Sequence, residues 1–514
     1  MCGIAGMWDG CSGQTLRGMI GKLAHRGPDG LGFWRSNGKI GLGHCRLAIM
    51  DPAAGAQPLY NEDESVAMVA NGEIYNYPRL RARLANRRHF RTGSDNEVIV
   101  HLFEERRAAT VLELDGMFAF AISDGEEIYL ARDAIGIKPL YVGTRQTGSQ
   151  KIWLFASEMK ALADVCETIH EFPPGSSFSS RDGWSRFYEH TAQEPEDRPL
   201  EEWLDLIRTT LEDAVVRRLM SDVPWGVFLS GGLDSSIIAA LVRPHITDLH
   251  SFAVGVEGSP DLDAARLVAR HLKTIHHEYV FTAEEARRDL GKVIYDLESF
   301  DQDLVRSALP CYYCSRLAGE RVKVILTGEG ADELMAGYDY HRTIRDPVAL
   351  HRELHRSVSA MHNINLQRVD RMTMAHGLEG RVPFLDTRVI DLFLRIPVEW
   401  KLRDDGSGRP VEKWILRRAF EHLLPSEIVW RRKKQFDEGS GAAAMMPQIA
   451  SSHSGQPDGP DHPDVPLRSA EERLYYRCFK ESFANWKRLQ PNVARWSIRE
   501  PEKPALPPLM TVSA

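Results

Sequence analysis

Residues 225–241 read WGVFLSGGLDSSIIAAL. An apolar run typical of a buried strand leads into the turn Ser230-Gly231-Gly232, and an apolar stretch long enough for a helix follows. The N–H groups and dipole at such a helix N-terminus bind phosphate, and glycine lets the backbone approach the ligand closely. The stretch therefore predicts a parallel α/β sheet that carries a nucleotide phosphate site.

This loop differs from the common phosphate-binding loops. It lacks the lysine of a GxxxxGK[ST] loop and does not fit GxGxxG. The hydroxyls of Ser230 and Ser235 can donate to phosphate oxygens, and Asp234 is placed to hold Mg2+ against the phosphates. The alternative is a structural glycine turn with a capping serine, but SGGxDS after an apolar strand is more specific than a glycine pair. We therefore predict a phosphate ligand together with Mg2+.

Two later apolar runs end in a similar way. SFAVG (251–255) places Val254 where it can pack on an adenine ring, and VILTGEGADE (324–333) ends in a glycine turn with acids. Ligands of open α/β sheets bind at the carboxyl ends of the strands. We therefore expect one crevice, in which Asp234 and Asp332 share a single Mg2+ ion.

The first part of the chain, residues 1–190, has a different pattern. Short apolar runs broken by glycine, proline and aspartate predict strands and hairpins, with helices over 78–86 and 96–107. Such a pattern is typical of antiparallel sheets with helices on their faces. We expect this part to form one domain.

A polar, proline-bearing segment from about 190 to 202 predicts a linker. Beyond it, continuous apolar runs alternate with helical stretches, as in a parallel sheet buried on both faces, over a second domain of residues 203–450. The part from about 340 to 445 has a mostly helical pattern. Residues 451–514 combine a proline-, glycine- and serine-rich loop, a helical segment and a tail that we expect to be disordered.

Length, composition and charge exclude several classes of protein. The chain has 514 residues, of which 43% are hydrophobic and 26% charged, and this balance suits two or three soluble domains. A net charge of −8 argues against a nucleic-acid binder, and no apolar run reaches the length of a membrane span. The seven cysteines, an odd and sparse set, fit a reducing compartment. We expect a cytoplasmic protein with small-molecule partners, and a homodimer is the assembly to test.

The chain begins MCGIAG, so Cys2 follows the initiator methionine. Aminopeptidases remove that methionine when the next side chain is small, which leaves Cys2 with a free α-amino group beside its thiol. One residue then combines a nucleophile with its own general base, as in an N-terminal threonine hydrolase. The alternative is a tolerant terminus without a chemical role.

Taken together, the motifs resemble those of the glutamine-dependent asparagine synthetases. The resemblance implies an α+β N-terminal nucleophile (Ntn) glutaminase sandwich, followed by an α/β parallel-sheet ATP-pyrophosphatase domain with a helical C-terminal part. It extends from the N-terminus to about residue 440, and the number, order and spacing of the motifs exclude chance. The matching motifs are MCGIAG (1–6), HRGPDG (25–30), HCRLAIMD (44–51), GAQPL (55–59), NGEIYNY (71–77), TGSDNEV (92–98), GMFAFA (116–121), RDAIGIKPLY (132–141), ASEMKAL (156–162), LSGGLDSS (229–236), TGEGADE (327–333), MAHGLEGRVPFLD (374–386) and RRKKQFDEG (431–439).

For the first domain, the resemblance implies a glutamine site. Cys2 is then the nucleophile, its own α-amino group moves the proton, and Asn71 with Gly72 forms the oxyanion hole. Arg46 pairs with the α-carboxylate of glutamine and Asp95 with its α-ammonium group. The predicted glutamine-binding residues are Arg46, Asn71, Glu73 and Asp95.

For the second domain, the resemblance implies that ATP adenylates a carboxylate and releases pyrophosphate. Ammonia then crosses an internal channel and displaces AMP, which is a good leaving group once Mg2+ and cations spread its charge. Glu329 matches the carboxylate that takes a proton from ammonia, and Lys433 matches a lysine that contacts phosphate. A non-catalytic relative that only binds nucleotide is the rival interpretation, and the intact catalytic residues argue against it. The predicted ATP-binding residues are Leu229, Ser230, Gly231, Gly232, Asp234, Ser235, Val254, Thr327, Gly328 and Lys433.

The predicted acceptor pocket departs from the family pattern. Asp303 and Leu304 stand where familiar bacterial members have two threonines, and Asn365 lies where they have an acid for the α-ammonium of aspartate, while Arg306 and Arg368 remain. In one interpretation Asp303 replaces the missing acid and aspartate fits, which the family favours. In the other, the acceptor is a more apolar carboxylic acid of specialised metabolism, with ammonia or another nitrogen nucleophile from a γ-glutamyl donor.

Overall fold

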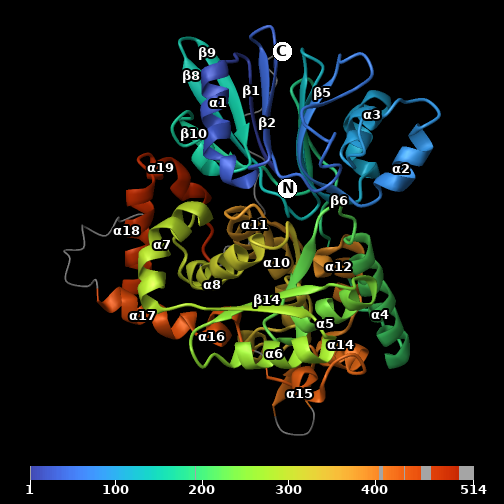
Figure 1. Cartoon of the computed structure of the whole chain (residues 1–514), viewed down its shortest axis with the longest axis vertical. Coiled ribbons are helices and arrows are strands. Elements are labelled where there is room, and N and C mark those ends of the chain that lie inside the picture. Colours follow the sequence, from blue (N-terminus) through green and yellow to red (C-terminus); the bar gives the residue numbers. More distant parts are fainter. Residues whose placement is uncertain (1, 192, 405–408, 433, 453–464, 497–514) are drawn as a thin grey trace.

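The computed structural model describes residues 2–191, 193–404, 409–432, 434–452 and 465–496. Its N-terminal half is a sandwich of two six-stranded antiparallel sheets (Figure 1). The first sheet has the order β10 (Thr168–Glu171), β8 (Tyr141–Thr147), β9 (Gln150–Ala156), β1 (Cys2–Trp8), β3 (Ile40–Arg46) and β2 (Gly30–Ser36). The second has the order β12 (Gly183–Arg186), β11 (Ser176–Ser179), β7 (Ile128–Arg132), β6 (Gly116–Ser123), β5 (Ala67–Ile74) and β4 (Leu59–Tyr60).

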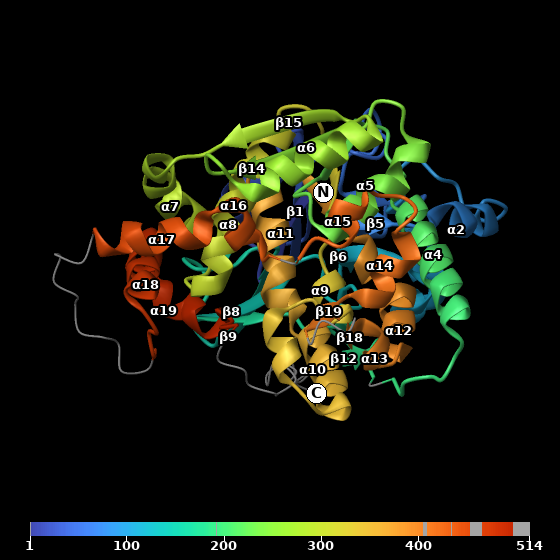
Figure 2. The same cartoon turned by 90° about the horizontal axis from the view of Figure 1, so that it is seen from below.

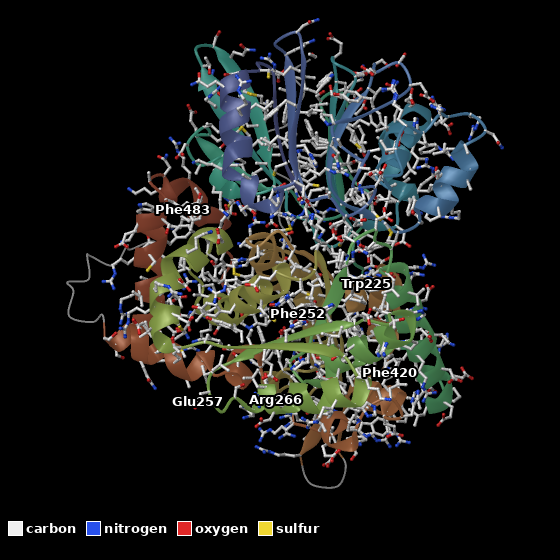
Figure 3. All side chains as sticks on the ribbon, in the orientation of Figure 1. Trp225, Phe252, Glu257, Arg266, Phe420 and Phe483 are labelled. Carbon is white, nitrogen blue, oxygen red and sulfur yellow. The ribbon has the colours of Figure 1, made fainter. Side chains whose placement is uncertain are left out.

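The sandwich forms because its central strands are apolar on both faces. Every residue of β1 and β5 is buried, whereas the edge strand β2 alternates between more and less exposed positions. Side chains of both sheets fill the space between them (Figure 3). The outer faces are covered by helices, as predicted: α1 (Gly13–Lys22), α2 (Tyr77–Leu84) and α3 (Glu97–Arg106), with the short 3-10 helices η1 (Ala24–Arg26), η2 (Arg107–Glu113) and η3 (Met159–Ala161).

The second half is built on a five-stranded parallel sheet, as the sequence predicted. Its order is β15 (Ile275–Val280), β14 (His250–Gly255), β13 (Trp225–Phe228), β16 (Val324–Leu326) and β17 (Glu379–Arg381). Side chains alternate along β14, so that Phe252 packs with helices α7 (Ala283–Leu297) and α8 (Gln302–Gly319) on one face. Ala253 packs with α5 (Leu233–Val242) and α6 (Pro260–Leu272) on the other.

The part from about 340 to 445 is mostly helical, as expected (Figure 2), but β17 lies within it and adds a strand to the edge of the parallel sheet. The sequence of β17, EGR, contains no apolar run, so the sequence pattern does not reveal it. The remaining α-helices are α4 (Leu200–Arg217), α9 (Ala331–Leu334), α10 (Pro347–Ser359), α11 (Asn365–Met374), α12 (Thr387–Arg395), α13 (Val398–Lys401), α14 (Trp414–Phe420), α15 (Ser426–Val429), α16 (Phe436–Ser440), α17 (Ala442–Ser451), α18 (Ala470–Ser482) and α19 (Trp486–Leu489). The other short elements are η4 (Arg243–His245), η5 (Asp339–Thr343), η6 (Met361–Asn363), η7 (Pro383–Leu385), η8 (Gln490–Asn492), β18 (Leu402–Asp404) and β19 (Pro410–Glu412).

The two halves share apolar clusters rather than meeting only through a linker. Leu47 and Met117 of the sandwich pack in the same cluster as β13 and α5, and Leu16 of α1 packs in the same cluster as α7 and α8. Within the described part of the chain, none of the helices combines the length and the apolar character that crossing a bilayer needs.

Candidate active sites

The first candidate site lies where β1 and β5 face each other across the sandwich. The backbone nitrogen of Cys2 donates to Oδ1 of Asn71 at 3.1 Å, and this nitrogen becomes the α-amino group once Met1 is removed. The thiol of Cys2 is buried, 4.0 Å from the carbonyl oxygen of Leu47, and burial raises its pKa. A thiol that stays protonated at neutral pH needs a base nearby, and the adjacent nitrogen can supply one.

Asn71 and Gly72 lie next to each other on β5. Nδ2 of Asn71 is buried and has no hydrogen-bond partner among the described residues, so it can donate to an oxyanion. Gly72 pairs with Phe118 of β6, and a Cβ at Gly72 would lie 2.1 Å from the carbonyl oxygen of Met117. Glycine is therefore required here by the close approach of β6, whatever else it does in the site.

Two buried carboxylates lie beside this pair. Asp95 lies two residues before the start of α3, and its Oδ2 accepts a hydrogen bond of 2.6 Å from the backbone nitrogen of Ile74. Burial raises the pKa of Asp95 to about 6, and burial together with Asp95 and Glu379 raises that of Glu73. The nearby cation is Arg381 of β17, whose guanidinium is 3.6 Å from Glu73. Two carboxylates thus face one guanidinium that the second half contributes, an arrangement that favours binding of a further cation.

Arg46 ends β3 at the rim of this site. Its guanidinium donates to the backbone carbonyl oxygens of Met50, Asp51 and Pro52, at 3.3, 2.6 and 3.1 Å. These bonds hold the planar group in place and leave it without an ion pair among the described residues, so its charge is available to an anionic ligand.

The sequence motifs did not indicate the role of Arg26, which is buried between the two halves. Its Nε donates to the backbone oxygen of Cys2 at 3.1 Å. The rest of its guanidinium bonds to Asp370 of α11 at 2.7 and 3.0 Å and to Glu158 at 2.6 Å. The strand that carries the nucleophile is therefore bonded to the second half. HRGPDG contains Arg26, but a motif does not show which partner a side chain will meet.

The second candidate site is a pocket at the carboxyl ends of β14, β13 and β16, which are neighbours in the sheet. This confirms the crevice that the three apolar runs predicted. Of the predicted ATP-binding residues, those that line the pocket are Leu229, Ser230, Gly232, Asp234, Ser235, Val254, Thr327 and Gly328. Gly231 belongs to the same loop but does not line the pocket. Its φ is +69°, and a Cβ there would lie 2.5 Å from the backbone of Ala264. Lys433 lies outside the described residues.

The loop after β13 has the form of an anion site. Gly232 caps α5 with its backbone only, so the first N–H groups of the helix point to the pocket without a side chain in front of them. The hydroxyls of Ser230 and Ser235 are 3.1 Å apart. Gly328 brings the neighbouring loop against α5, because a Cβ there would lie 2.8 Å from the backbone nitrogen of Ser235. The two loops therefore line one phosphate-sized space.

Asp234 and Asp332 meet, but a lysine that the sequence did not indicate meets them too. The ammonium group of Lys413, which immediately precedes α14, pairs with Asp234 and lies 2.6 Å from Asp332. Carboxylate oxygens are the donors that Mg2+ prefers, so this set fits the ion. Lys413 is fully buried, and no local pattern in EKWILRR distinguishes it from a surface lysine.

The predicted acceptor residues lie in the same pocket, with one exception. Asp303, Leu304, Asn365 and Arg368 line it, but Arg306 is not among its described lining residues. Arg306 instead forms a bidentate pair with Glu471 of α18, at 2.7 and 2.6 Å. The partner of Arg306 is on a helix far along the chain, so the position of Arg306 in the motif did not reveal this contact.

Two of the predicted acceptor residues, Arg368 and Asn365, contact acidic side chains. Arg368 of α11 pairs with Glu329, the residue predicted to take a proton from ammonia. Nδ2 of Asn365 donates to Glu333 at 2.6 Å and to Tyr338 at 3.2 Å. Burial and Asp332 raise the pKa of Glu333 to about 7. The neutral amide of Asn365 thus occupies a place next to an acid, where a second carboxylate would be repelled.

Comparison with known proteins agrees with this arrangement. A family model described as "Glutamine amidotransferase domain" matches residues 1–176, and one described as "Asparagine synthase" matches residues 206–348 and 343–488. Asparagine synthetase (glutamine-hydrolyzing) 2 of Arabidopsis thaliana is 43% identical over 519 residues, which cover 94% of this chain and 87% of that protein. Asparagine synthetase B (glutamine-hydrolyzing) of Escherichia coli strain K12 is 43% identical over 465 residues, 86% of this chain and 83% of that protein. The chain therefore belongs to the glutamine-hydrolysing asparagine synthetase family.

Proposed function

We propose that the protein is a glutamine-dependent amidotransferase that converts aspartate to asparagine and cleaves ATP to AMP and pyrophosphate. One observation supports this most directly. A single chain brings Cys2 against Asn71, and one apolar cluster joins the sandwich to the part that carries a pocket with two acids, Asp234 and Asp332, at its strand ends.

In the glutamine site, the thiol of Cys2 attacks the side-chain amide of glutamine, and its α-amino group carries the proton to the leaving ammonia. Nδ2 of Asn71 and the backbone N–H of Gly72 stabilise the oxyanion. Arg46 holds the α-carboxylate, and Asp95, beside Glu73, holds the α-ammonium group. A cation there would relieve the crowding of the two buried carboxylates, and this supports the assignment.

In the nucleotide pocket, the backbone N–H groups after Gly231 and the hydroxyls of Ser230 and Ser235 bind the phosphates of ATP, and Val254 packs on the adenine. Asp234 and Asp332 would hold Mg2+, which supplies charge neutralisation for the departing pyrophosphate. Lys413 holds the two carboxylates close together, because its ammonium group contacts each of them.

At the acceptor end, the carboxylate of aspartate attacks the α-phosphorus of ATP, and ammonia from the first site then displaces AMP. Arg368 is placed to bind an acceptor carboxylate and at the same time holds Glu329, which takes the proton from the attacking ammonia. We propose domains of 1–190 and 203–450, with 451–514 as a further segment. The free thiols of all seven cysteines support a reducing compartment, which we propose is the cytoplasm.

The test follows the transferred nitrogen atom and the products of ATP cleavage. Glutamine labelled with 15N in its side-chain amide, together with ATP and aspartate, should give 15N-asparagine, glutamate, AMP and pyrophosphate in equal amounts. Formation of ADP and phosphate would contradict adenylation. Pyrophosphate release that depends on another carboxylic acid, with none for aspartate, would contradict the acceptor.

A further inference from the structure

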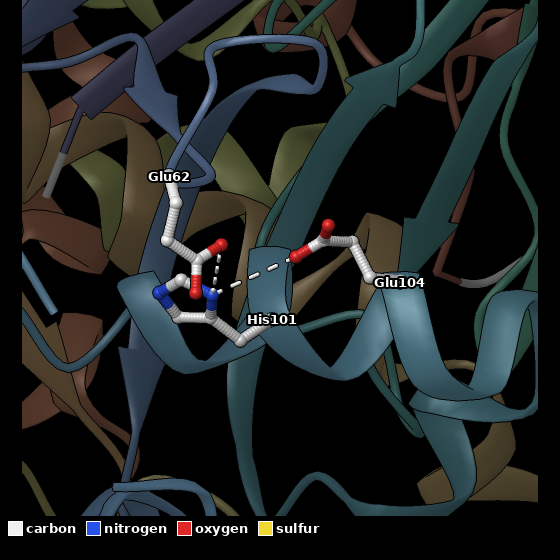
Figure 4. A group of neighbouring side chains, drawn as sticks. All are labelled: Glu62, His101 and Glu104. Carbon is white, nitrogen blue, oxygen red and sulfur yellow. Dashed lines mark ion pairs between the residues drawn. The ribbon is translucent and has the colours of Figure 1, made fainter. Parts of the chain in front are cut away.

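A second group of polar side chains lies on the outside of the sandwich, on the sheet that contains β5. His101 and Glu104 are on α3, one turn apart, and Glu62 is on the loop between β4 and β5 (Figure 4). One ligand-type atom from each of the three lies within 4.8 Å of the other two. The site described above uses none of these residues.

The imidazole of His101 has an exposed fraction of 0% and points into this group. Its Nδ1 is 3.8 Å from Oε2 of Glu62 and 3.7 Å from Oε2 of Glu104, and among the described residues it has no hydrogen-bond partner. Its Nε2 is 3.6 Å from Oε1 of Glu97, one turn earlier on α3. A buried imidazole nitrogen without a donor or acceptor is costly, so this geometry calls for a ligand.

The surrounding bonds orient the three side chains as an outer shell does around a metal. The other oxygen of Glu62 accepts from the backbone nitrogen of His89 at 3.1 Å, and the other oxygen of Glu104 accepts from Asn61 at 3.1 Å. Glu97 is itself held by Thr92, at 2.6 and 2.8 Å. A carboxylate at Nε2 favours the tautomer whose proton is on Nε2, which leaves the lone pair of Nδ1 facing two carboxylate oxygens.

Three electron-pair donors that face one another repel unless a cation lies between them. Arg88 supplies part of that charge, because its guanidinium is 3.1 Å from Glu104 and 3.8 Å from Glu62. A guanidinium has only N–H donors, and each N–H group bonds to its own acceptor. It therefore does not bring the two carboxylate oxygens and the lone pair of Nδ1 to one point, as a metal ion does. Arg88 is partly exposed, so it can turn toward solvent when another cation enters.

We propose that Glu62, His101 and Glu104 bind a divalent transition-metal ion of the Zn2+ type. One imidazole and two carboxylates form a three-ligand set that leaves a fourth position for water, and imidazole disfavours Mg2+ and Ca2+. Metal–ligand bonds near 2.0–2.2 Å place tetrahedral ligand atoms about 3.3–3.6 Å apart. The two distances from Nδ1 to the carboxylate oxygens, 3.8 and 3.7 Å, are therefore within a few tenths of an ångström of that geometry. The ion would join α3, which begins two residues after Asp95, to the β4–β5 loop.

The experiment uses the full chain after chelation, titrated with Zn2+ and, in parallel, with Co2+ as a spectroscopic probe. The parent should bind one more equivalent of Zn2+ than His101→Gln and should unfold at a higher temperature with the ion. Loss of the imidazole should weaken binding at this site by at least about 100-fold, because losing a direct ligand costs at least as much as losing an outer-shell partner. Glu104→Gln serves as the second variant if His101→Gln folds poorly.

Two further variants separate the proposal from its competitors. Glu64→Gln removes an acid from the same loop without removing a ligand atom, and its binding should equal that of the parent. Arg88→Gln removes the competing cation and should bind Zn2+ several-fold more tightly. Equal binding by the parent and His101→Gln, or a Co2+ spectrum with thiolate bands only, would overturn the proposal. Failure of both the parent and Arg88→Gln to bind Zn2+ would also overturn it.

Discussion

The acidic side chains of the glutamine site and of the nucleotide pocket have different cationic partners. In the glutamine site, Asp95 and Glu73 are buried, and the nearby guanidinium of Arg381 comes from the other half of the chain. In the nucleotide pocket, Asp234 and Asp332 already share the ammonium group of Lys413. The first site has one nearby guanidinium for two acids, so the ammonium group of the proposed substrate would add a second positive charge. The second site already contains a cation and, in the proposed function, receives a substrate rich in negative charge.

This difference has a chemical consequence. In the proposed mechanism, the α-ammonium of glutamine compensates the acids of the first site only while it is bound, so recognition and charge balance coincide there. ATP brings several negative charges to the second pocket, so Lys413 has to be in place beforehand to hold the two acids together for Mg2+. The first site therefore selects its substrate by charge, and the second stabilises charge that develops during reaction.

The largest expected effect separates the two sites altogether. Cys2→Ala should lower glutamine-dependent synthesis by about 1,000-fold or more, because the nucleophile is lost, while synthesis from ammonium chloride stays near the parent rate. The measurement compares asparagine formation with each nitrogen source. Cys11→Ala, which removes a half-buried thiol elsewhere, is the control. Parent-level glutamine hydrolysis by Cys2→Ala would contradict the assignment.

A smaller loss of activity is expected for substitutions in the nucleotide pocket. Asp234→Asn and Asp332→Asn should each lower pyrophosphate release by about 100-fold, because each removes one negative charge from the place where Mg2+ balances the leaving group. Glutaminase activity should persist in both. The exposed acid Glu257 lies in the same half of the molecule (Figure 3), and Glu257→Gln is the control. Loss of glutamine hydrolysis in all three variants would show damage to the fold instead.

The charge state of Asp95 provides a pH test of the first site. Burial raises the pKa of Asp95 to about 6, so this carboxyl loses its charge as the pH falls through 6 and the KM for glutamine should rise there. Asp95→Asn should lower kcat/KM at pH 7.5 by about 10- to 100-fold, because one charge-assisted contact is lost. It should also remove this inflection.

The same raised pKa has the opposite effect on stability. An unfolded aspartate ionises near pH 3.9, so stability due to Asp95 falls between pH 3.9 and about 6 and stays lower above that range. Asp95→Asn should therefore unfold at a higher temperature than the parent at pH 7.5, although it binds glutamine less well. The exposed variant Asp182→Asn is the control for both measurements. A pH profile shared by Asp95→Asn and the parent would contradict this assignment.

The smallest expected effect concerns the acceptor. Leu304→Thr should lower the KM for aspartate by less than about tenfold, because a hydroxyl adds one hydrogen bond to an apolar wall. Asn365→Asp should lower the KM for aspartate by a smaller factor, because its new carboxylate would face Glu333. The measurement is pyrophosphate release as a function of aspartate concentration. If micromolar aspartate saturates the parent and both variants lose activity, the pocket already fits aspartate and Leu304 is part of that fit.

Most of the fold could be predicted because its signals are local. Apolar runs marked β13, β14 and β16, and glycine turns after β13 and β16 indicated where a nucleotide would bind. β17 could not be predicted, because its sequence, EGR, has no apolar run and the segment joins the sheet only where β16 offers an edge. Arg306 has the right motif position, yet its contact is with Glu471, 165 residues further along the chain.

The sequence by itself determined which chemistry is available, because the type and spacing of Cys2, Asn71 and Asp234 depend only on the order of residues. The tertiary structure decided which charges meet. Lys413 lies 179 residues after Asp234, and Arg381 reaches Glu73 from the opposite half. Electrostatic interactions depend on distance and burial in space, and neither can be read from separation along the chain.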